Sequence, residues 1–389
     1  GDSYLETQHR QSACVGSISL SATMRGSVDD EQSIAANLVL SSKALRRQSA
    51  EQLALMRDTR DSLAFSELPR MRELVSQQRA RREQSITGSG HGLAMAAACA
   101  GMSPLARQQH HASGLAGIRD LRALDERLRN DSELETFAGE LSALHEKLQA
   151  NRPELLCIGE PGTADELVAE AHDRLTGMRH ADGDTRLDLP RLRERRGECW
   201  ITNTQVNFCA RAYPTVPVGH PDAAALTVLG GFLRNGFLHR AIREQGGAYG
   251  GGASQDSIVA AFRFFSYRDP RLSETLGDFD ESVSWLLGNP HSADAVEEAV
   301  LGVISSLDKP ASPAGEARQD FHNRRFGRDH AQRMQFRQRV LAVTLDDLLR
   351  VAKAYLRPEL ASTAVITGAA QRDASAALRQ ELDLTLCEL

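Results

Sequence analysis

Two side chains that could bind a ligand lie close together in the second half of the sequence. Arg243 and Tyr249 are six positions apart, and Gly246 and Gly247 lie between them. Glycine adopts positive φ without strain and lets a backbone approach a ligand closely. Arginine carries five donors in a planar fork, and tyrosine carries a hydroxyl that can donate or accept a hydrogen bond. The spacing predicts a pair of side chains that grip a ligand at the mouth of a glycine-rich turn.

The glycines also have less specific interpretations. Three more glycines follow Tyr249 at positions 250–252. A phosphate-binding loop would need a Lys-Ser or Lys-Thr pair and would open a helix, and neither condition is met here. A plain hairpin with a loose turn explains the same residues. Under that interpretation Tyr249 makes a hydrogen bond in the core and Arg243 makes an ion pair on the surface.

The flanking sequence predicts the elements that would position this pair. Apolar residues at helical spacing predict a helix over 222–243 that ends at Gly246 and Gly247. Residues 258–267 are apolar and aromatic, as in a mostly buried strand. Asp269 and Pro270 predict the N-cap and the first position of the next helix. A helix and a strand would therefore hold the turn from both sides.

A similar order of elements is predicted twice along the chain. Alternating residues predict a strand over 15–26, and a charged helix over 68–86 leads to a glycine turn at 85–91. The polar segment 179–196 predicts a linker, after which a strand over 199–213 begins the second unit. Arg-Glu-Gln precedes both glycine segments. The remaining elements of the first unit are expected as helices over 29–45, 47–64, 119–150 and 163–178 and a short strand over 155–158.

The composition limits the classes of function. The 389 residues are enough for two domains, and a net charge of −6 gives no reason to expect a nucleic-acid partner. No stretch approaches the ~18 apolar residues of a membrane span. The six cysteines show no paired spacing, which favours reduced thiols over a disulfide framework. The chain begins without methionine, and we expect it to be a piece of a longer protein.

Several segments together resemble the C-terminal half of proteins of the insulinase (pitrilysin) family, in its presequence-protease branch. The most specific are IREQGGAYG at 242–250 and FSYRDP at 265–270. Weaker resemblance extends to 206–213, 233–239, 40–45 and 88–94. The resemblance implies an α+β fold of two tandem homologous αβ domains, each a mostly antiparallel sheet with helices on one face. These would be the third and fourth domains of the full protease, at 1–178 and 197–389, joined by the linker 179–196, with the Arg/Tyr motif on the fourth.

The resemblance also implies an activity that this chain does not complete. Members of this family are zinc peptidases that degrade unstructured peptides in a closed chamber. They need His-x-x-Glu-His, which does not occur in this sequence. The partner expected is therefore an N-terminal half that carries zinc, with no metal bound by this chain. By resemblance, Tyr249 would stabilise the oxyanion in trans, and Arg243, Gly246, Gly247 and Tyr249 would bind the peptide substrate.

Two alternatives of a different kind stay open. A non-catalytic scaffold or partner subunit of the same fold needs neither Arg243 nor Tyr249, so the presence of both favours a substrate-binding half. A nucleotide-binding module is disfavoured by the position of the glycines and the missing lysine. The resemblance implies a location in the bacterial cytoplasm or, in a eukaryote, in the mitochondrial matrix or another organelle.

Overall fold

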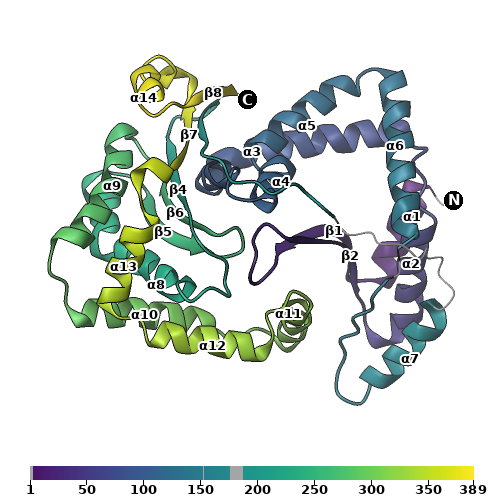
Figure 1. The fold of residues 1–389 in the computed structure, drawn as a ribbon. Coiled ribbons are helices and arrows are strands. Elements are labelled where there is room, and N and C mark those ends of the chain that lie inside the picture. The colour runs from purple at the N-terminus through teal and green to yellow at the C-terminus, as the bar shows by residue number, and fades with distance from the viewer. Residues whose placement is uncertain (1–2, 152, 176–186) are drawn as a thin grey trace.

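The computed structural model describes residues 3–151, 153–175 and 187–389 (Figure 1). The second half of the chain forms a six-stranded sheet with helices on both faces. A group of N-terminal helices stands to one side of it, and a two-stranded hairpin lies between the two groups. Within the described ranges, no helix has the length and apolar character needed to cross a membrane.

The six-stranded sheet has the order β5-β6-β4-β7-β3-β8. Its strands are β3 (Gly197–Thr202), β4 (Phe208–Pro214), β5 (Gly250–Asp256), β6 (Ala261–Tyr267), β7 (Ser362–Gly368) and β8 (Thr385–Glu388). Neighbouring strands from β5 to β7 are antiparallel, whereas β3 is parallel to both β7 and β8. The strand that follows Tyr249, β5, is therefore an edge strand.

Helices cover both faces of this sheet because the central strands are apolar on both sides. On β4, Cys209 belongs to one core and its neighbours Phe208 and Ala210 belong to the other, as the alternation of a strand requires. The first core is completed by α8 (Ala223–Leu233), the π-helical η2 (Arg234–Gln245), α9 (Ser273–Gly288), α10 (Ala293–Leu307), α12 (His330–Leu341) and α13 (Leu345–Tyr355). Nearby lie α11 (Pro313–Arg325), α14 (Ala376–Glu381) and the short η3 (Pro358–Leu360) and η4 (Ala369–Gln371).

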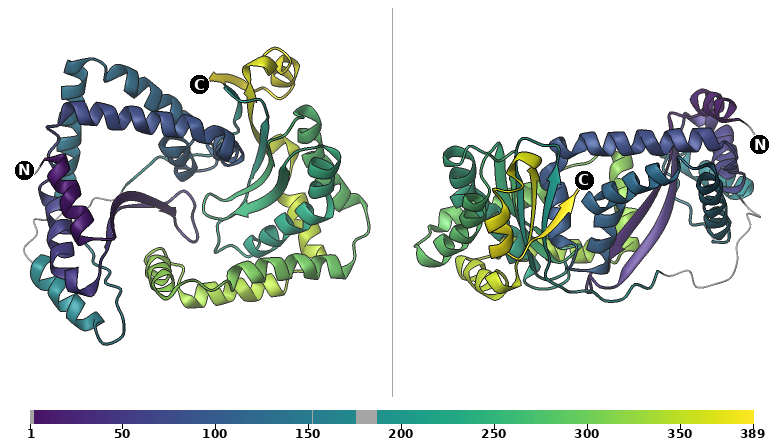
Figure 2. Two further views of the ribbon diagram at one scale, coloured as in Figure 1. Left: turned by 180° about the vertical axis from the view of Figure 1, so that it is seen from behind. Right: turned by 90° about the horizontal axis from the view of Figure 1, so that it is seen from above.

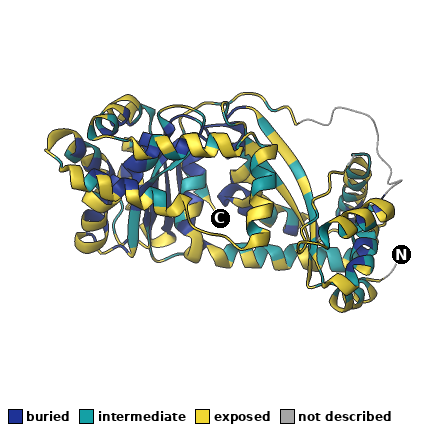
Figure 3. Cartoon of the chain, turned by 90° about the horizontal axis from the view of Figure 1, so that it is seen from below, coloured by how far each residue is buried: buried dark blue, intermediate teal, exposed yellow. Residues whose placement is uncertain are grey.

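The second core is formed with helices from the first half of the chain. The long helix α3 (Leu68–Cys99) packs on β4, β6 and β7, and α4 (Pro104–Ser113) and α5 (Leu115–Arg127) lie beside it. Figure 2 shows α3 extending from the N-terminal helices to the sheet. Buried residues gather around the sheet, and the N-terminal helices are largely exposed (Figure 3). The first half therefore supplies one layer of the core of the second half.

The rest of the first half consists of a hairpin and peripheral helices. Strands β1 (Ser17–Gly26) and β2 (Ile34–Lys43) pair antiparallel over their full length. The helices are α1 (Tyr4–Cys14), η1 (Arg46–Gln48), α2 (Ser49–Asp61), α6 (Asp131–Gln149) and α7 (Ala164–Leu175). The predicted α+β class with mainly antiparallel sheets is confirmed. The two halves differ, however, because the described part of the first has two strands and the second has six.

Two predictions in the first half are wrong, and tertiary contacts explain both. The predicted helix over 29–45 is the strand β2, because its residues pair with β1 in register from Ser17 opposite Lys43 to Gly26 opposite Ile34. The predicted glycine turn at 85–91 lies inside α3, which continues without a break. The predicted strand over 155–158 is irregular. Local pattern did not register these long-range contacts.

Three predictions in the second half also need correction. The strand expected over 199–213 is two strands, β3 and β4, that are not neighbours in the sheet. The three glycines at 250–252 belong to strand β5 and not to a turn. Asp269 does not cap a helix at Pro270, since α9 begins at Ser273. The helix over 222–243 is confirmed as α8 followed by η2.

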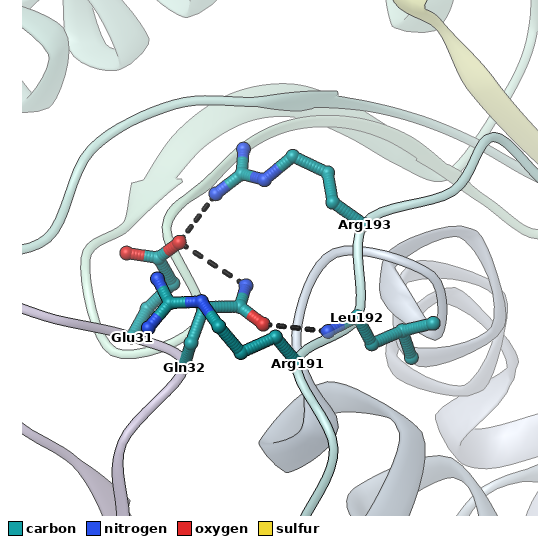
Figure 4. Close-up of a pocket in the computed structure, with 5 residues that line it drawn as sticks. All are labelled: Glu31, Gln32, Arg191, Leu192 and Arg193. Carbon is teal, nitrogen blue, oxygen red and sulfur yellow. Dashed lines mark hydrogen bonds and ion pairs between the residues drawn. The ribbon is translucent and has the colours of Figure 1, made fainter.

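The segment predicted as a linker is only partly described. Residues 179–186 lie outside the described residues, and 187–196 are irregular. Leu192 donates its backbone N–H to Gln32 Oε1 at 2.8 Å, and Arg193 pairs with Glu31, both at the tip of the β1–β2 hairpin (Figure 4). Gln32 also donates to the carbonyl of Met102 at 3.0 Å. The end of this segment is thus fixed to the hairpin.

Candidate functional site

The glycine pair ends a helix in the way its sequence predicts, although each glycine is needed for a different reason. Gly247 has φ of +78°, which favours glycine. Gly246 has an ordinary φ, but a Cβ there would overlap the guanidinium of Arg271. The backbone N–H groups of Gly247 and Ala248 donate to the carbonyls of Arg243 and Ile242, both at 3.1 Å. These bonds satisfy carbonyls that the end of η2 would leave free.

Arg243 and Tyr249 are both exposed at this helix end. The Tyr249 side chain follows the turn directly, and the residue is 67% exposed. In the part of the chain that the structure describes, no side chain forms a hydrogen bond or an ion pair with the Arg243 guanidinium or the Tyr249 hydroxyl. The core hydrogen bond and the surface ion pair of the less specific interpretation are therefore not seen. Both side chains have donors free for a ligand.

The backbone of Tyr249 is held by the sheet. Its N–H lies 3.1 Å from the carbonyl of Tyr267 and 3.4 Å from that of Arg268, at the end of β6. Next to it, Arg268 has φ of +50°. The buried Asp269 then accepts hydrogen bonds from the Arg271 N–H at 2.9 Å and from the Thr275 hydroxyl at 2.8 Å. The site therefore stands on an ordered turn.

The turn below the site holds a carboxyl group out of water. Burial raises the pKa of Asp269, although the hydrogen bonds from Arg271 and Thr275 oppose the rise. Asp269 also exchanges backbone hydrogen bonds with Asn207, each of 2.8 Å. Asn207 accepts from the hydroxyl of Thr367 at 2.6 Å. The turn is thereby joined to β7 in the middle of the sheet.

Sequence reasoning missed the aromatic residues that surround Tyr249. Its ring meets the ring of Tyr267 edge to face, with centroids 5.4 Å apart. Tyr267 also contacts His91 from α3 at 4.8 Å. No spacing in the sequence connects residues 91 and 249, because the contact depends on α3 reaching across to the second half.

A second group of buried polar side chains lies away from this site, between α4 and β3. His110 Nε2 is 3.6 Å from a carboxylate oxygen of Glu198, which also accepts from Trp200 Nε1 at 2.7 Å. Burial lowers the pKa of His110 to about 4, against the opposing effect of Glu198. Within the described ranges, no group of three or more His, Cys, Asp or Glu side chains could hold a metal ion. This chain's described residues therefore offer no metal centre.

Family models match both halves of the chain. A model described as a region associated with peptidases of family M16, subgroup C, matches residues 1–124, and one described as "PreP C-terminal domain" matches residues 197–366. The second match contains the whole segment from η2 to β6.

Curated relatives agree with these matches. A mitochondrial presequence protease of Yarrowia lipolytica is 29% identical over 330 residues, which cover 82% of this chain and 32% of that protein. A mitochondrial presequence protease of Danio rerio is 28% identical over 392 residues, covering 91% of this chain and 36% of that protein. The chain thus spans about a third of the length of these relatives.

Solved structures share the fold. A conserved protein from Enterococcus faecalis matches with a TM-score of 0.62 and 13% identity, over 94% of this chain and 85% of that one. The peptidase M16 inactive domain from Pseudomonas fluorescens matches with a TM-score of 0.59 and 16% identity, over 95% and 84%. The resemblance noted in the sequence is confirmed: the chain belongs to the presequence-protease-like branch of the insulinase (pitrilysin) family and corresponds to the C-terminal half of such a protein.

Proposed function

We propose that this chain is the substrate-binding half of a zinc-dependent endopeptidase that degrades unstructured peptides in a closed chamber. The observation that carries the proposal is the pair Arg243 and Tyr249, which are exposed with free donors at an ordered helix end. A scaffold subunit has no use for two such donors. The zinc-bearing N-terminal half would be the partner, and peptides would be the substrate.

The two side chains would have separate roles. Hydrolysis of a peptide bond develops negative charge on the carbonyl oxygen, and a donor fixed near that oxygen stabilises the transition state by about 3–4 kcal/mol. The Tyr249 hydroxyl would be this donor. The planar guanidinium of Arg243 would hold backbone carbonyls of the peptide. Gly246 and Gly247 would keep the backbone between them close to the substrate.

The metal would be held by the other half. Bound zinc in such an enzyme polarises the scissile carbonyl and lowers the pKa of a water molecule. The residues described here would bind and orient the peptide. The curated relatives are named as mitochondrial, which favours the organellar location over the bacterial cytoplasm.

The proposal is tested first on the chain by itself. After treatment with chelator and dialysis, we expect metal analysis to find no stoichiometric zinc, and a quenched fluorescent peptide to remain uncut. Hydrolysis that copurifies with the chain through a further column and is abolished by chelator would refute the proposal.

A further inference from the structure

Tyr249 has little direct support for its ring. Two-thirds of the residue is exposed, and the ring that contacts it among the described residues is that of Tyr267, at 5.4 Å and an interplanar angle of 88°. An exposed tyrosine without such a contact samples several rotamers, each staggered about χ1. Edge-to-face contact favours one of them. The direction of the Tyr249 hydroxyl therefore depends on where the Tyr267 ring lies.

Tyr267 is in turn held from the opposite half of the chain. It is the last residue of β6, and its ring meets His91 of α3 at 4.8 Å with an interplanar angle of 67°. Phe208 of β4 lies 6.0 Å from the same ring, and the guanidinium of Arg268 lies 5.4 Å from its centroid. His91 also contacts Phe265, at 5.8 Å. Tyr267 is thus enclosed by groups from α3 and the sheet.

The position of His91 is fixed by close packing of its helix. A Cβ at the neighbouring Gly90 would lie 2.6 Å from atoms of the Phe208 ring, so only glycine lets α3 approach the sheet this closely. Burial lowers the pKa of His91, and its Nδ1 is buried with no hydrogen-bond partner. The imidazole at this point therefore acts as a packed ring and not as a hydrogen-bonding group.

We propose that His91 and Tyr267 are positioning residues for Tyr249, so that helix α3 of the first half sets the direction of the tyrosine on the second half. The inference rests on the proposed function only where turnover is concerned, since the ring contacts exist in the chain itself. It gives the first half a part in the substrate site, although it contributes no side chain to the Arg243–Tyr249 pair.

The ring arrangement can be tested in this chain without any activity. The sequence has five tyrosines, so labelling with 3-fluorotyrosine gives five fluorine signals, and loss of one in Tyr249→Phe assigns Tyr249. We expect the Tyr249 signal to shift in His91→Ala and in Tyr267→Leu, and to return toward its original position in the ring-retaining His91→Phe. The buried Tyr213 provides an internal check that each variant is folded. His111→Ala, at an exposed histidine of α4, is the matched control and should leave the Tyr249 signal in place.

Turnover provides the second readout, in the longer protein that carries the zinc-bearing half. We expect His91→Ala to lower kcat by about three- to tenfold with little change in KM, as the loss of one aromatic contact would give. His91→Phe should recover most of that loss. A Tyr249 signal that does not move in folded His91→Ala and Tyr267→Leu overturns the inference, whatever the turnover. A signal that moves while Tyr249→Phe has normal turnover supports the positioning and refutes the proposed role of Tyr249.

Discussion

At the scale of single residues, the hydroxyl of Tyr249 carries the chemical part of the proposal. The oxyanion exists only near the transition state, so a donor directed at it raises kcat more than it improves substrate binding. In the longer protein we expect Tyr249→Phe to lower kcat about 100-fold or more with KM nearly unchanged. Steady-state kinetics on an unstructured peptide would measure it. Tyr4→Phe, in α1, is the matched control, and equal rates in both variants would remove Tyr249 from the mechanism.

Arg243 should act on binding as well as on rate. Its guanidinium has no partner among the described residues, so its removal leaves no buried group unpaired in the free protein. Loss of hydrogen bonds from a charged donor costs about 1.5–3 kcal/mol, or roughly 10- to 100-fold in kcat/KM. We expect Arg243→Ala to raise KM and to lower kcat.

Arg240→Ala is the control for this change. Arg240 is also exposed and lies on the same π-helical segment, three residues earlier. A similar loss of kcat/KM in both variants would show a general effect of positive charge and would contradict a specific role for Arg243.

At the scale of elements, the turn between η2 and β5 holds the pair. Gly247 has φ of +78°, and a residue with a Cβ loses about 1–2 kcal/mol in that conformation. Urea denaturation should therefore show that Gly247→Ala lowers the free energy of unfolding by about 1 kcal/mol or more. A Cβ at Gly250 would meet nothing within 4 Å, so Gly250→Ala should change it little. Equal losses at both positions would mean that the positive φ is not what requires glycine.

The contact between α4 and β3 predicts how stability depends on pH. The pKa of His110 is lowered to about 4 in the folded chain and is about 6.5 when unfolded. The unfolded state therefore binds more protons between these values, and stability falls as pH drops from 6.5 toward 4. The contribution is about 3 kcal/mol at most. We expect His110→Gln to show a shallower loss over this range in denaturant titrations, and an unchanged slope would contradict the assignment.

At the scale of the whole molecule, sequence patterns predicted the second half better than the first. Helix 222–243 and strand 258–267 were predictable because their apolar residues follow one period and pack on a nearby sheet. Strand β2 was not, because Ile34, Leu38 and Val39 also fit helical spacing and only pairing with β1 decides between the two. The glycines of α3 have the same explanation, since Gly90 is required by Phe208, more than a hundred residues later.

The site itself divides in the same way. Arg243, Tyr249 and the glycine pair lie within seven residues, so a local motif was enough to identify them. Their support by Tyr267 and His91 depends on α3 packing under the sheet, which no local pattern contains. The domain boundary at 179–196 stays a prediction. The packing of α3 on the sheet means that the two halves share a core and do not fold as separate layers.

The most direct test of the account is reconstitution with a zinc-bearing N-terminal half. The two halves, expressed as one chain or mixed, should cleave a quenched fluorescent peptide, and neither should do so alone. Replacing this half by its Arg243→Ala/Tyr249→Phe double variant should reduce kcat/KM by at least 100-fold, while Arg240→Ala/Tyr4→Phe should retain it. Cleavage by the N-terminal half alone at the full rate, or an unimpaired double variant, would contradict a substrate-binding role for this chain.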